Sequence, residues 1–386
     1  MPHCLLAVNA GSATLKFRAY RADGETLLLS GMVDRFGSRD EVLLLQDAKG
    51  TRLLEKPLPG GSREEAVGAM LNALADHKVH ITAVAHRVVH GGASLSAPVH
   101  IDDEVRHTLE GLIALAPLHQ PVSLSVIDAF TALDPGLMQI ACFDTAFHTT
   151  QPPLAQRFGI ARHWHDEGVR RYGFHGLSFA SIVRRFPELG LAESRVVVCH
   201  LGSGSSACAI AGSRSVAAST GFSAVDGLMM STRPGSLDPE VLLYWMEHEG
   251  MGVPEVRREL YKNSGLLGVS GLSADIRVLL ASPTVEAREA VDLFCYLTAR
   301  EVASLAGAMK GLDALVFTAG IGEHSPEVRA RVVQQLSWLG FELDHSANLA
   351  QARCITTPAS RLKAFRLQTD EEGEMARLAS ALLHPA

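Results

Sequence analysis

Two stretches of the chain, "LLAVNAGSATLKFRAY" (residues 5–20) and "VVVCHLGSGSSACAIAG" (residues 196–212), share one plan. Each begins with an apolar run, turns through Gly-Ser and continues with a second β-rich run, as a hairpin does. The two Gly-Ser pairs, Gly11-Ser12 and Gly202-Ser203, lie about half of the 386-residue chain apart. A single echo of this kind also arises by chance, because strand-turn-strand units are common. If it is real, it predicts two domains of the same type, with both glycine turns facing a shared cleft.

Elsewhere, short apolar runs alternate with segments of helical spacing, which predicts an α/β protein. Strands are expected at "ITAVAHRVV", "MQIACFD" and "DALVFTAG". Helices are expected over residues 63–77, 239–249, 285–310 and 326–339. Asp238 and Ser325 are N-cap residues in this interpretation, each followed by a proline at the first helical position. At this length two domains are expected, and "AFHTTQPP" (146–153) marks the break between them.

The composition excludes several classes of function. A formal net charge of −7 argues against non-specific nucleic-acid binding, which needs clustered Lys and Arg. The six cysteines have neither C-x-x-C nor zinc-like spacing, so they are expected to be buried thiols in a reducing compartment. No apolar run reaches the ~18 residues that a membrane span requires. A cytoplasmic enzyme acting on small molecules is the expectation, with neither nucleic acid nor membrane as partner.

The glycine turn "HLGSGSS" (200–206) is open to three interpretations: a phosphate cradle, a serine-nucleophile turn or a plain hairpin loop. Glycine lets backbone N–H groups approach a phosphate closely, because no Cβ intervenes. The turn is not a P-loop, and it does not match the nucleophile-elbow sequence G-x-S-x-G. A third turn, Gly320-Ile-Gly322, follows a strand and precedes a capped helix, which is where nucleotides commonly bind. Three such turns favour a nucleotide held between two domains.

Ten motifs in a fixed order make the sequence resemble the acetate kinase family, which includes propionate and butyrate kinases, and they span nearly the whole chain. They are, in order, "VNAGSATLKF", "HRVVHGG", "LAPLHQP", "FDTAFH", "RRYGFHG", "HLGSGSS", "GLMMSTRPGSLDP", "SADIR", "FTAGIGEHS" and "TDEE".

The resemblance implies two similar ribonuclease-H-like domains of the actin-like ATPase superfamily, with a nucleotide cleft between them. The expected domains are residues 1–148, completed by a C-terminal helix at about 374–386, and the nucleotide-binding residues 149–373. The implied reaction is reversible, ATP-dependent phosphorylation of a short-chain carboxylate to the acyl phosphate, by direct in-line transfer. ATP/ADP is the implied nucleotide, Mg²⁺ the implied metal with Mn²⁺ as an alternative, and a homodimer the implied assembly, for which the helix at 285–310 could supply an interface.

Residue by residue, the resemblance implies three catalytic side chains. Arg233 carries a permanent charge on a planar fork that suits phosphoryl oxygens, and Arg87 suits the substrate carboxylate for the same reason. His175 is expected to donate to the phosphoryl group, although a lone histidine is more often structural. Asp144 is expected to orient Mg²⁺ through water, since a carboxylate nucleophile needs no base. His119 is weighed as mainly structural.

The remaining implied positions form three groups. For the metal they are Asn9 and Glu371, although a carboxylate near the start of a helix is also favoured by the helix dipole without any metal. For the acyl group they are Val89, Leu118, Phe174 and Ala224 besides Arg87. For the nucleotide they are Lys16, His200, Leu201, Gly202, Ser203, Gly204, Asp275, Ile276, Arg277, Gly320, Ile321, Gly322, Glu323 and His324.

Some positions depart from the family pattern. Ser203 and His324 each stand where asparagine is usual, and Ala13 and Thr14 replace serines in the first turn, which leaves the nucleotide preference open. Ala224 stands where proline is usual, so the acyl pocket is expected to admit one more methylene and to accept propionate beside acetate. Rival interpretations are a dedicated propionate or butyrate kinase, a non-catalytic actin-like nucleotide-binding protein, and a sugar kinase of the same superfamily. The last would need an Asp base and polar sugar-binding loops.

Overall fold

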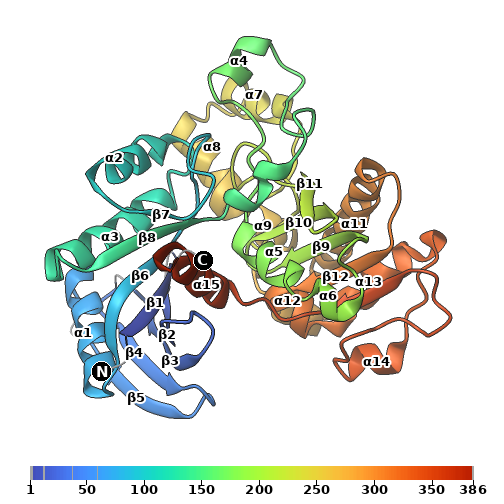
Figure 1. Cartoon of the computed structure of the whole chain (residues 1–386). Coiled ribbons are helices and arrows are strands. Elements are labelled where there is room, and N and C mark those ends of the chain that lie inside the picture. The colour runs from blue at the N-terminus through green and yellow to red at the C-terminus, as the bar shows by residue number, and fades with distance from the viewer. Residues whose placement is uncertain (1–2, 12–13, 37, 59, 385–386) are drawn as a thin grey trace. The chain divides into compact units, whose positions relative to one another are not determined.

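The computed structural model describes residues 3–11, 14–36, 38–58 and 60–384 (Figure 1). Ser12 and Ala13 of the first glycine turn lie outside these ranges. The chain divides into two compact units. Unit 1 comprises the chain up to Phe147, Gly176–Ser181 and the residues from Asp370 onward, and unit 2 comprises His148–His175 and Ile182–Thr369.

In unit 1, eight strands within the described ranges form one sheet in the order β5-β4-β3-β2-β1-β6-β8-β7. β1 pairs antiparallel with β2 and parallel with β6, so the first hairpin is confirmed. The strands are β1 (His3–Ala10), β2 (Thr14–Arg21), β3 (Leu27–Asp34), β4 (Val42–Asp47), β5 (Arg52–Pro57), β6 (His80–Val88), β7 (Val99–His100) and β8 (Met138–Phe143). The helices are α1 (Arg63–Asp76), α2 (Asp103–Gly111), α3 (Gln120–Leu133) and α15 (Glu371–Leu383), with short 3₁₀ turns at Leu112–Ala114 and Ala146–Thr150.

Strand β1 is buried on both faces, because its side chains alternate between two cores. Leu6 and Val8 pack with α1 and α3 residues, whereas Leu5 and Ala7 pack with Met375 and neighbouring residues of α15. Figure 1 shows α15, coloured dark red, beside these strands. The C-terminal helix is therefore part of the unit-1 core. Helix α5 (Gly176–Val183) begins in unit 1 and ends in unit 2.

In unit 2, five strands within the described ranges form a sheet in the order β11-β10-β9-β12-β13. They are β9 (Arg195–Leu201), β10 (Ser205–Ala211), β11 (Arg214–Ala218), β12 (Ala314–Thr318) and β13 (Lys363–Arg366). The helices are α4 (Arg162–Asp166), α6 (Phe186–Leu189), α7 (Pro239–Glu247), α8 (Val253–Arg258), α9 (Gly265–Ser270), α10 (Ile276–Ala281), α11 (Val285–Ala308), α12 (Ala319–His324), α13 (Pro326–Gln335) and α14 (His345–Leu349), with a π turn at Glu259–Asn263 and a 3₁₀ turn at Ser337–Leu339.

The two sheets repeat one strand plan. In unit 2, β9 pairs antiparallel with β10 and parallel with β12, as β1 pairs with β2 and β6 in unit 1. The predicted duplication of an α/β sheet that opens with a hairpin is thus confirmed. Local signals placed the helix starts correctly: the Asp238 side chain caps α7 and the Ser325 side chain caps α13, each with proline in the first turn. The sequence did not predict β3, β4, β5, β11 or β13.

Two expectations about helices need correction. Gly320 and Gly322 were expected in a turn before a helix, but they belong to the short helix α12, which begins directly after β12. The apolar face of helix α11 was named as one that could supply a subunit interface. That face is instead the centre of the unit-2 core, with Val291, Phe294 and Val302 no more than 1% exposed.

Candidate active site

In unit 1, three predicted residues meet at the carboxyl ends of neighbouring strands. Arg87 lies near the end of β6, Asp144 directly follows β8, and Asn9 lies near the end of β1. Nη2 of Arg87 donates to Asp144 Oδ2 at 2.6 Å and Nε to the same oxygen at 3.0 Å, while Nη1 donates to Asn9 Oδ1 at 3.1 Å. Because Asp144 is only 1% exposed, this bidentate ion pair is a buried one.

Two acids at the start of α15 join this cluster. The Asn9 side-chain amide donates to Glu371 Oε2 and to Glu372 Oε1, both at 3.2 Å, and Nε of Arg87 lies 4.0 Å from Glu371 Oε2. Burial raises the pKa of Glu371, and the positive charges of Arg87 and Lys16 oppose that rise. Amide and carboxylate oxygens therefore gather here, although no cluster of three His, Cys, Asp or Glu with metal-binding geometry occurs among the described residues.

The negative charges around Arg87 stabilise its protonated form. Burial by itself lowers the pKa of Arg87, but Asp144 and Glu371 more than offset that effect, so the net shift is upward. Lys16, predicted to bind nucleotide, is exposed on β2 of unit 1, paired in register with Asn9. The unit-1 site is therefore a cluster of alternating charges in which the guanidinium is already bonded.

Unit 2 contains a cavity of about 950 Å³. Its walls come from the β9–β10 turn, the loop before α7, α10, and α12 with the start of α13. Eight predicted nucleotide-binding residues line it: Gly202, Ser203, Asp275, Ile276, Arg277, Gly320, Ile321 and His324. The volume and the mixed lining suit a nucleotide-sized ligand.

The cavity has further walls that sequence reasoning missed. Ser231 and Thr232 lie two and one residues before Arg233, inside a quoted motif, so the motif itself contained that signal. Leu280 and Ala281 lie one helical turn beyond Ile276 and Arg277, so helical spacing could have found them. Ala274, which lies inside another quoted motif, and the start of α13 with its N-cap, at Ser325, Pro326 and Glu327, complete the lining.

Several predicted nucleotide-binding residues do not line this cavity: His200, Leu201, Gly204, Gly322 and Glu323. Leu201 is fully buried in the apolar core of unit 2. The Glu323 carboxylate, from a residue only 5% exposed, points inward and accepts hydrogen bonds from the Ala319 and Thr369 amides. The side chains of Leu201 and Glu323 are thus used by the fold, because backbone donors and apolar neighbours surround them.

The β9–β10 turn is crowded where His175 and Arg233 approach it. A Cβ at Gly204 would lie 2.8 Å from Nη2 of Arg233 and 3.2 Å from Nε2 of His175, so both side chains approach the turn closely where glycine has no Cβ. Nδ1 of His175 is 2.8 Å from Ser206 Oγ, and its ring stacks on His200 with centroids 4.1 Å apart. His175 also has φ +58°, a strained conformation for a residue with a side chain. The structure brings both predicted catalytic residues of unit 2 to the glycine turn.

Arg233 has very different surroundings from Arg87. Its Nη1 donates to the Ala224 carbonyl oxygen at 2.6 Å, and no carboxylate pairs with it in the described part of the chain. Burial lowers the pKa of Arg233, which nevertheless stays charged at neutral pH. A desolvated guanidinium beside a glycine turn is ready to bind an anion.

The predicted acyl-pocket residues are divided between the units. Val89 and Leu118 belong to unit 1, and Phe174 and Ala224 belong to unit 2. Val89 and Phe174 are buried, Ala224 is half-buried, and Leu118 is exposed. Within unit 2, the Phe174 backbone is fixed by Thr220 Oγ1, which accepts from its N–H, and by His148 Nε2, which lies 3.0 Å from its carbonyl oxygen.

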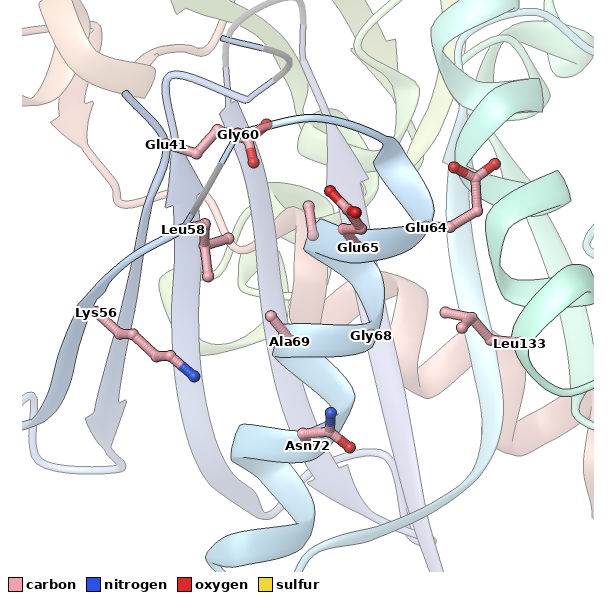
Figure 2. A pocket seen from close by; sticks show the side chains of 11 residues that line it. Glu41, Lys56, Leu58, Gly60, Glu64, Glu65, Gly68, Ala69, Asn72 and Leu133 are labelled. Carbon is pink, nitrogen blue, oxygen red and sulfur yellow. The ribbon is translucent and has the colours of Figure 1, made fainter. Parts of the chain in front are cut away.

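Other features of the chain lie apart from these residues. A second cavity of about 500 Å³ lies in unit 1 beside α1, with Glu41, Lys56 and Leu133 among its walls (Figure 2), and no predicted site residue lines it. No cysteine in the described ranges forms a disulfide, and five of the six are buried, as expected. Among the described helices, none combines the length and the apolar character needed to cross a membrane.

Comparison with known proteins agrees with the resemblance seen in the motifs. The sequence profile of the Acetokinase family matches residues 4–377. The chain belongs to the acetokinase family. An acetate kinase of Rhodopseudomonas palustris (strain TIE-1) is 46% identical, over 98% of this chain and 98% of its own. An acetate kinase of Methylocella silvestris is 44% identical, over 99% and 98%.

Solved structures of the acetokinase family superpose along nearly the whole chain. A propionate kinase from Francisella tularensis matches with a TM-score of 0.92 and 32% identity, covering 97% of this chain and 98% of its own. The acetate kinase of Porphyromonas gingivalis matches with a TM-score of 0.87 and 34% identity, covering 99% and 100%. The predicted actin-like fold and reaction class are confirmed: this acetokinase is an enzyme that phosphorylates a short-chain carboxylate with ATP.

Proposed function

We propose that the enzyme uses acetate as its principal acceptor, accepts propionate beside it, and transfers the γ-phosphoryl group of ATP directly and in line. A carboxylate oxygen attacks the γ-phosphorus. The bond from that phosphorus to the β,γ-bridging oxygen breaks, and ADP leaves with the electron pair. Because the attacking carboxylate is already ionised, catalysis needs positioning and charge neutralisation and no base.

The observation that carries this proposal is the desolvated Arg233 beside the β9–β10 glycine turn. A half-buried, desolvated guanidinium without a carboxylate partner gains most from an anion whose charge is spread over several oxygens, as in the transferring phosphoryl group. His175 supports the same assignment, because its Nδ1 is engaged with Ser206 Oγ while its Nε2 lies over Gly204. In the tautomer that we propose, Nδ1 accepts from the serine hydroxyl, and Nε2 carries the proton and donates to a phosphoryl oxygen.

The nucleotide is proposed to occupy the unit-2 cavity. Backbone N–H groups at Gly202 and Ser203 follow the phosphates, and the segment 275–277 encloses the nucleoside together with Gly320, Ile321 and His324. Arg87 binds the substrate carboxylate.

A divalent cation, Mg²⁺ with Mn²⁺ as the alternative, fits the oxygen donors of Asn9 and Glu371. Hard oxygen ligands with several retained waters are what Mg²⁺ prefers, and the Glu371 carboxylate, whose side chain is only 12% exposed, is stabilised by added positive charge. When bound, such an ion neutralises phosphate charge. Asp144, held by Arg87, is proposed to orient its waters.

The reaction is tested by trapping. With ATP, Mg²⁺ and acetate, hydroxylamine should capture an acyl hydroxamate, and ADP with acetyl phosphate should yield ATP. Omitting the carboxylate and chelating the metal are the controls. Absence of product in both directions, with every short carboxylate tried, would overturn the proposed reaction.

Acceptor preference is tested by steady-state rates for acetate, propionate and butyrate. The half-buried Ala224, where proline is usual, supports room for one more methylene. Exclusion of one methylene is worth about 1–3 kcal/mol in discrimination between two acceptors. A propionate rate below a few per cent of the acetate rate would mean that the pocket excludes this methylene, and it would contradict the proposal.

A homodimer is part of the proposal, with α7 in its interface. Helix α7 has the apolar sequence PEVLLYWME but no buried residue in this single chain, and Leu243, Tyr244 and Met246 are 41–52% exposed. Such a patch favours a partner surface, and we assign it to a second copy of this chain. Light scattering should give a dimer mass, and Leu243→Glu with Tyr244→Glu should give a monomer. A wild-type monomer, or an unchanged dimer in the variant, would contradict this assignment.

A cytoplasmic location completes the proposal, supported by six cysteines without a disulfide in the described ranges. Cell fractionation with activity measured in each fraction tests it. Activity confined to the membrane or exported fraction would be the contrary result.

A further inference from the structure

Helix α12 begins at a strained residue beside the unit-2 cavity. It starts directly after β12, and Gly320, Ile321 and His324 from it line the cavity. Its first residue, Ala319, has φ +64°, a left-handed conformation that residues with a Cβ rarely adopt. That conformation requires contacts that hold this residue in place, because the relaxed backbone would turn elsewhere.

The Glu323 carboxylate supplies those contacts from inside. Its Oε1 accepts from the Ala319 N–H at 2.9 Å, from the Thr318 hydroxyl at 3.3 Å and from the Thr369 N–H at 3.0 Å. Thr369 is the last residue of unit 2 before the chain enters unit 1 at Asp370. One oxygen thus joins the end of β12, the start of α12 and the point where the chain leaves the unit.

Arg329 of α13 holds the other end of α12. Its side chain is fully buried, and Nη1 donates to the carbonyl oxygens of Gly322 at 2.8 Å and Glu323 at 2.9 Å. Nε and Nη2 donate to the side-chain and backbone oxygens of Asn348, and Nη2 also donates to Gln351 Oε1 at 2.9 Å. All of these acceptors are neutral, and burial lowers the pKa of Arg329 to about 10, so it remains charged at neutral pH.

A buried charge held only by neutral oxygens is expensive, and it persists when its hydrogen bonds define a backbone arrangement. Here the acceptors include the last carbonyls of a six-residue helix, where a cation is electrostatically favoured. Neither Glu323 nor Arg329 lines the cavity. Their contacts act on the backbone that does.

We propose that Glu323 and Arg329 are positioning residues that fix α12 from both ends and thereby set the affinity for the nucleotide without touching it. This inference rests on the proposed nucleotide site in unit 2. In this proposal Glu323 acts through the backbone of Ala319 and Gly320, and not through the direct nucleotide contact that the sequence suggested.

The chain offers a matched pair of variants for Glu323. In Glu323→Gln the amide oxygen can keep all three hydrogen bonds, because all three donors meet one oxygen. In Glu323→Met, a side chain of similar length removes them. We expect Glu323→Met to raise the KM for ATP and the Kd for ADP about tenfold, equivalent to about 1.4 kcal/mol, with kcat within about threefold of wild type. Glu323→Gln should stay close to wild type in both constants.

Arg329 is tested in the same way, and its contact with Gln351, which lies outside α12, provides the control. Arg329→Lys keeps a charge but loses the fork, so the ATP KM should rise by a similar factor. Gln351→Met removes a bond to Arg329 that does not involve α12, and it should leave KM unchanged. Arg329→Lys also keeps the inference testable if Glu323→Met does not fold.

Calorimetry with ADP and melting temperatures separate the possible outcomes. A purely structural role would lower the melting temperature and the active fraction, with KM and Kd unchanged, and that result would overturn the inference. An equal rise of Kd in Glu323→Gln and Glu323→Met would also overturn it, since the hydrogen bonds would then not matter. If wild-type enzyme bound no ADP, the proposed nucleotide site itself would fall, and the inference with it.

Discussion

The arginine that the sequence singles out in unit 1 and the one in unit 2 have opposite surroundings. Arg87 is bonded to Asp144 and Asn9 and lies close to Glu371, and its pKa is shifted upward in net. Arg233 is bonded to one neutral carbonyl, and burial lowers its pKa. Both were predicted to bind anions of the reaction.

The difference separates two ways of preparing a cation for catalysis. Arg87 is held in place by carboxylates, so it is rigid and already compensated, and removing it leaves buried negative charge without a partner. Arg233 is desolvated and uncompensated, so it weakens the fold slightly and gains most when an anion arrives. Replacing Arg233 should therefore affect activity more than stability, whereas replacing Arg87 should strongly affect stability.

The largest expected effect is on turnover at Arg233. Arg233→Met should lower kcat by roughly 10³-fold, the scale on which an arginine stabilises a transferring phosphoryl group. The midpoint of urea unfolding should stay the same or rise, because a desolvated charge that is bonded to one neutral carbonyl oxygen is removed. Steady-state rates and urea titrations measure the two quantities. A large loss of stability with little loss of kcat would reverse the comparison.

The next effect is on stability at Arg87. Arg87→Met should lower the free energy of unfolding by about 3–5 kcal/mol, since the buried Asp144 carboxylate loses its partner. Arg106→Met is the matched control in the same unit. It breaks ion pairs with Asp128 and Glu110, whose side chains are 49% and 57% exposed, and it should cost no more than about 1 kcal/mol. Equal losses in the two variants would show that burial of the Arg87 pair is unimportant.

A smaller effect concerns acceptor size near each arginine. Ala224 accepts the hydrogen bond of Arg233 through its carbonyl, and Val89 lies two residues beyond Arg87. Ala224→Pro keeps that carbonyl and fills space, so it should lower the propionate-to-acetate ratio of kcat/KM by about tenfold, within the 1–3 kcal/mol that one methylene is worth. Val89→Ala should move the ratio in the opposite direction. Unchanged ratios in both variants would remove these residues from acceptor selection.

The smallest effect is expected at Ser203. This residue lies in the β9–β10 turn, which Arg233 approaches, and it lines the unit-2 cavity. If backbone N–H groups make the phosphate contacts, Ser203→Asn should change the KM for ATP by less than about threefold, below 1 kcal/mol. Ser203→Gly is the control that removes the side chain. A tenfold fall of KM in Ser203→Asn would show that an asparagine side chain contributes there and that this enzyme lacks the contact.

Much of the fold could be predicted from sequence because the responsible signals are local. The hairpins follow from alternating apolar runs around Gly-Ser turns, and the starts of α7 and α13 follow from Asp238 and Ser325 with the prolines after them. Strand β5, which is almost entirely exposed, lacks a clear apolar alternation, and the sequence missed it. The motifs also located eight residues of the unit-2 cavity, since each belongs to a short turn or helix start.

The sequence by itself determined the duplicated hairpins, the helix caps and the family, because these depend on neighbours a few residues apart and on motif order. Only the tertiary structure decided which charges meet. Glu323 turns inward because the Thr369 amide lies beside it, and the apolar face of α11 lies in a core. Arg87 is compensated by Asp144 from another strand, whereas Arg233 has no such partner in the described chain. Pairing and burial depend on residues distant in sequence, and a charge's surroundings decide whether it stabilises the fold or awaits a substrate.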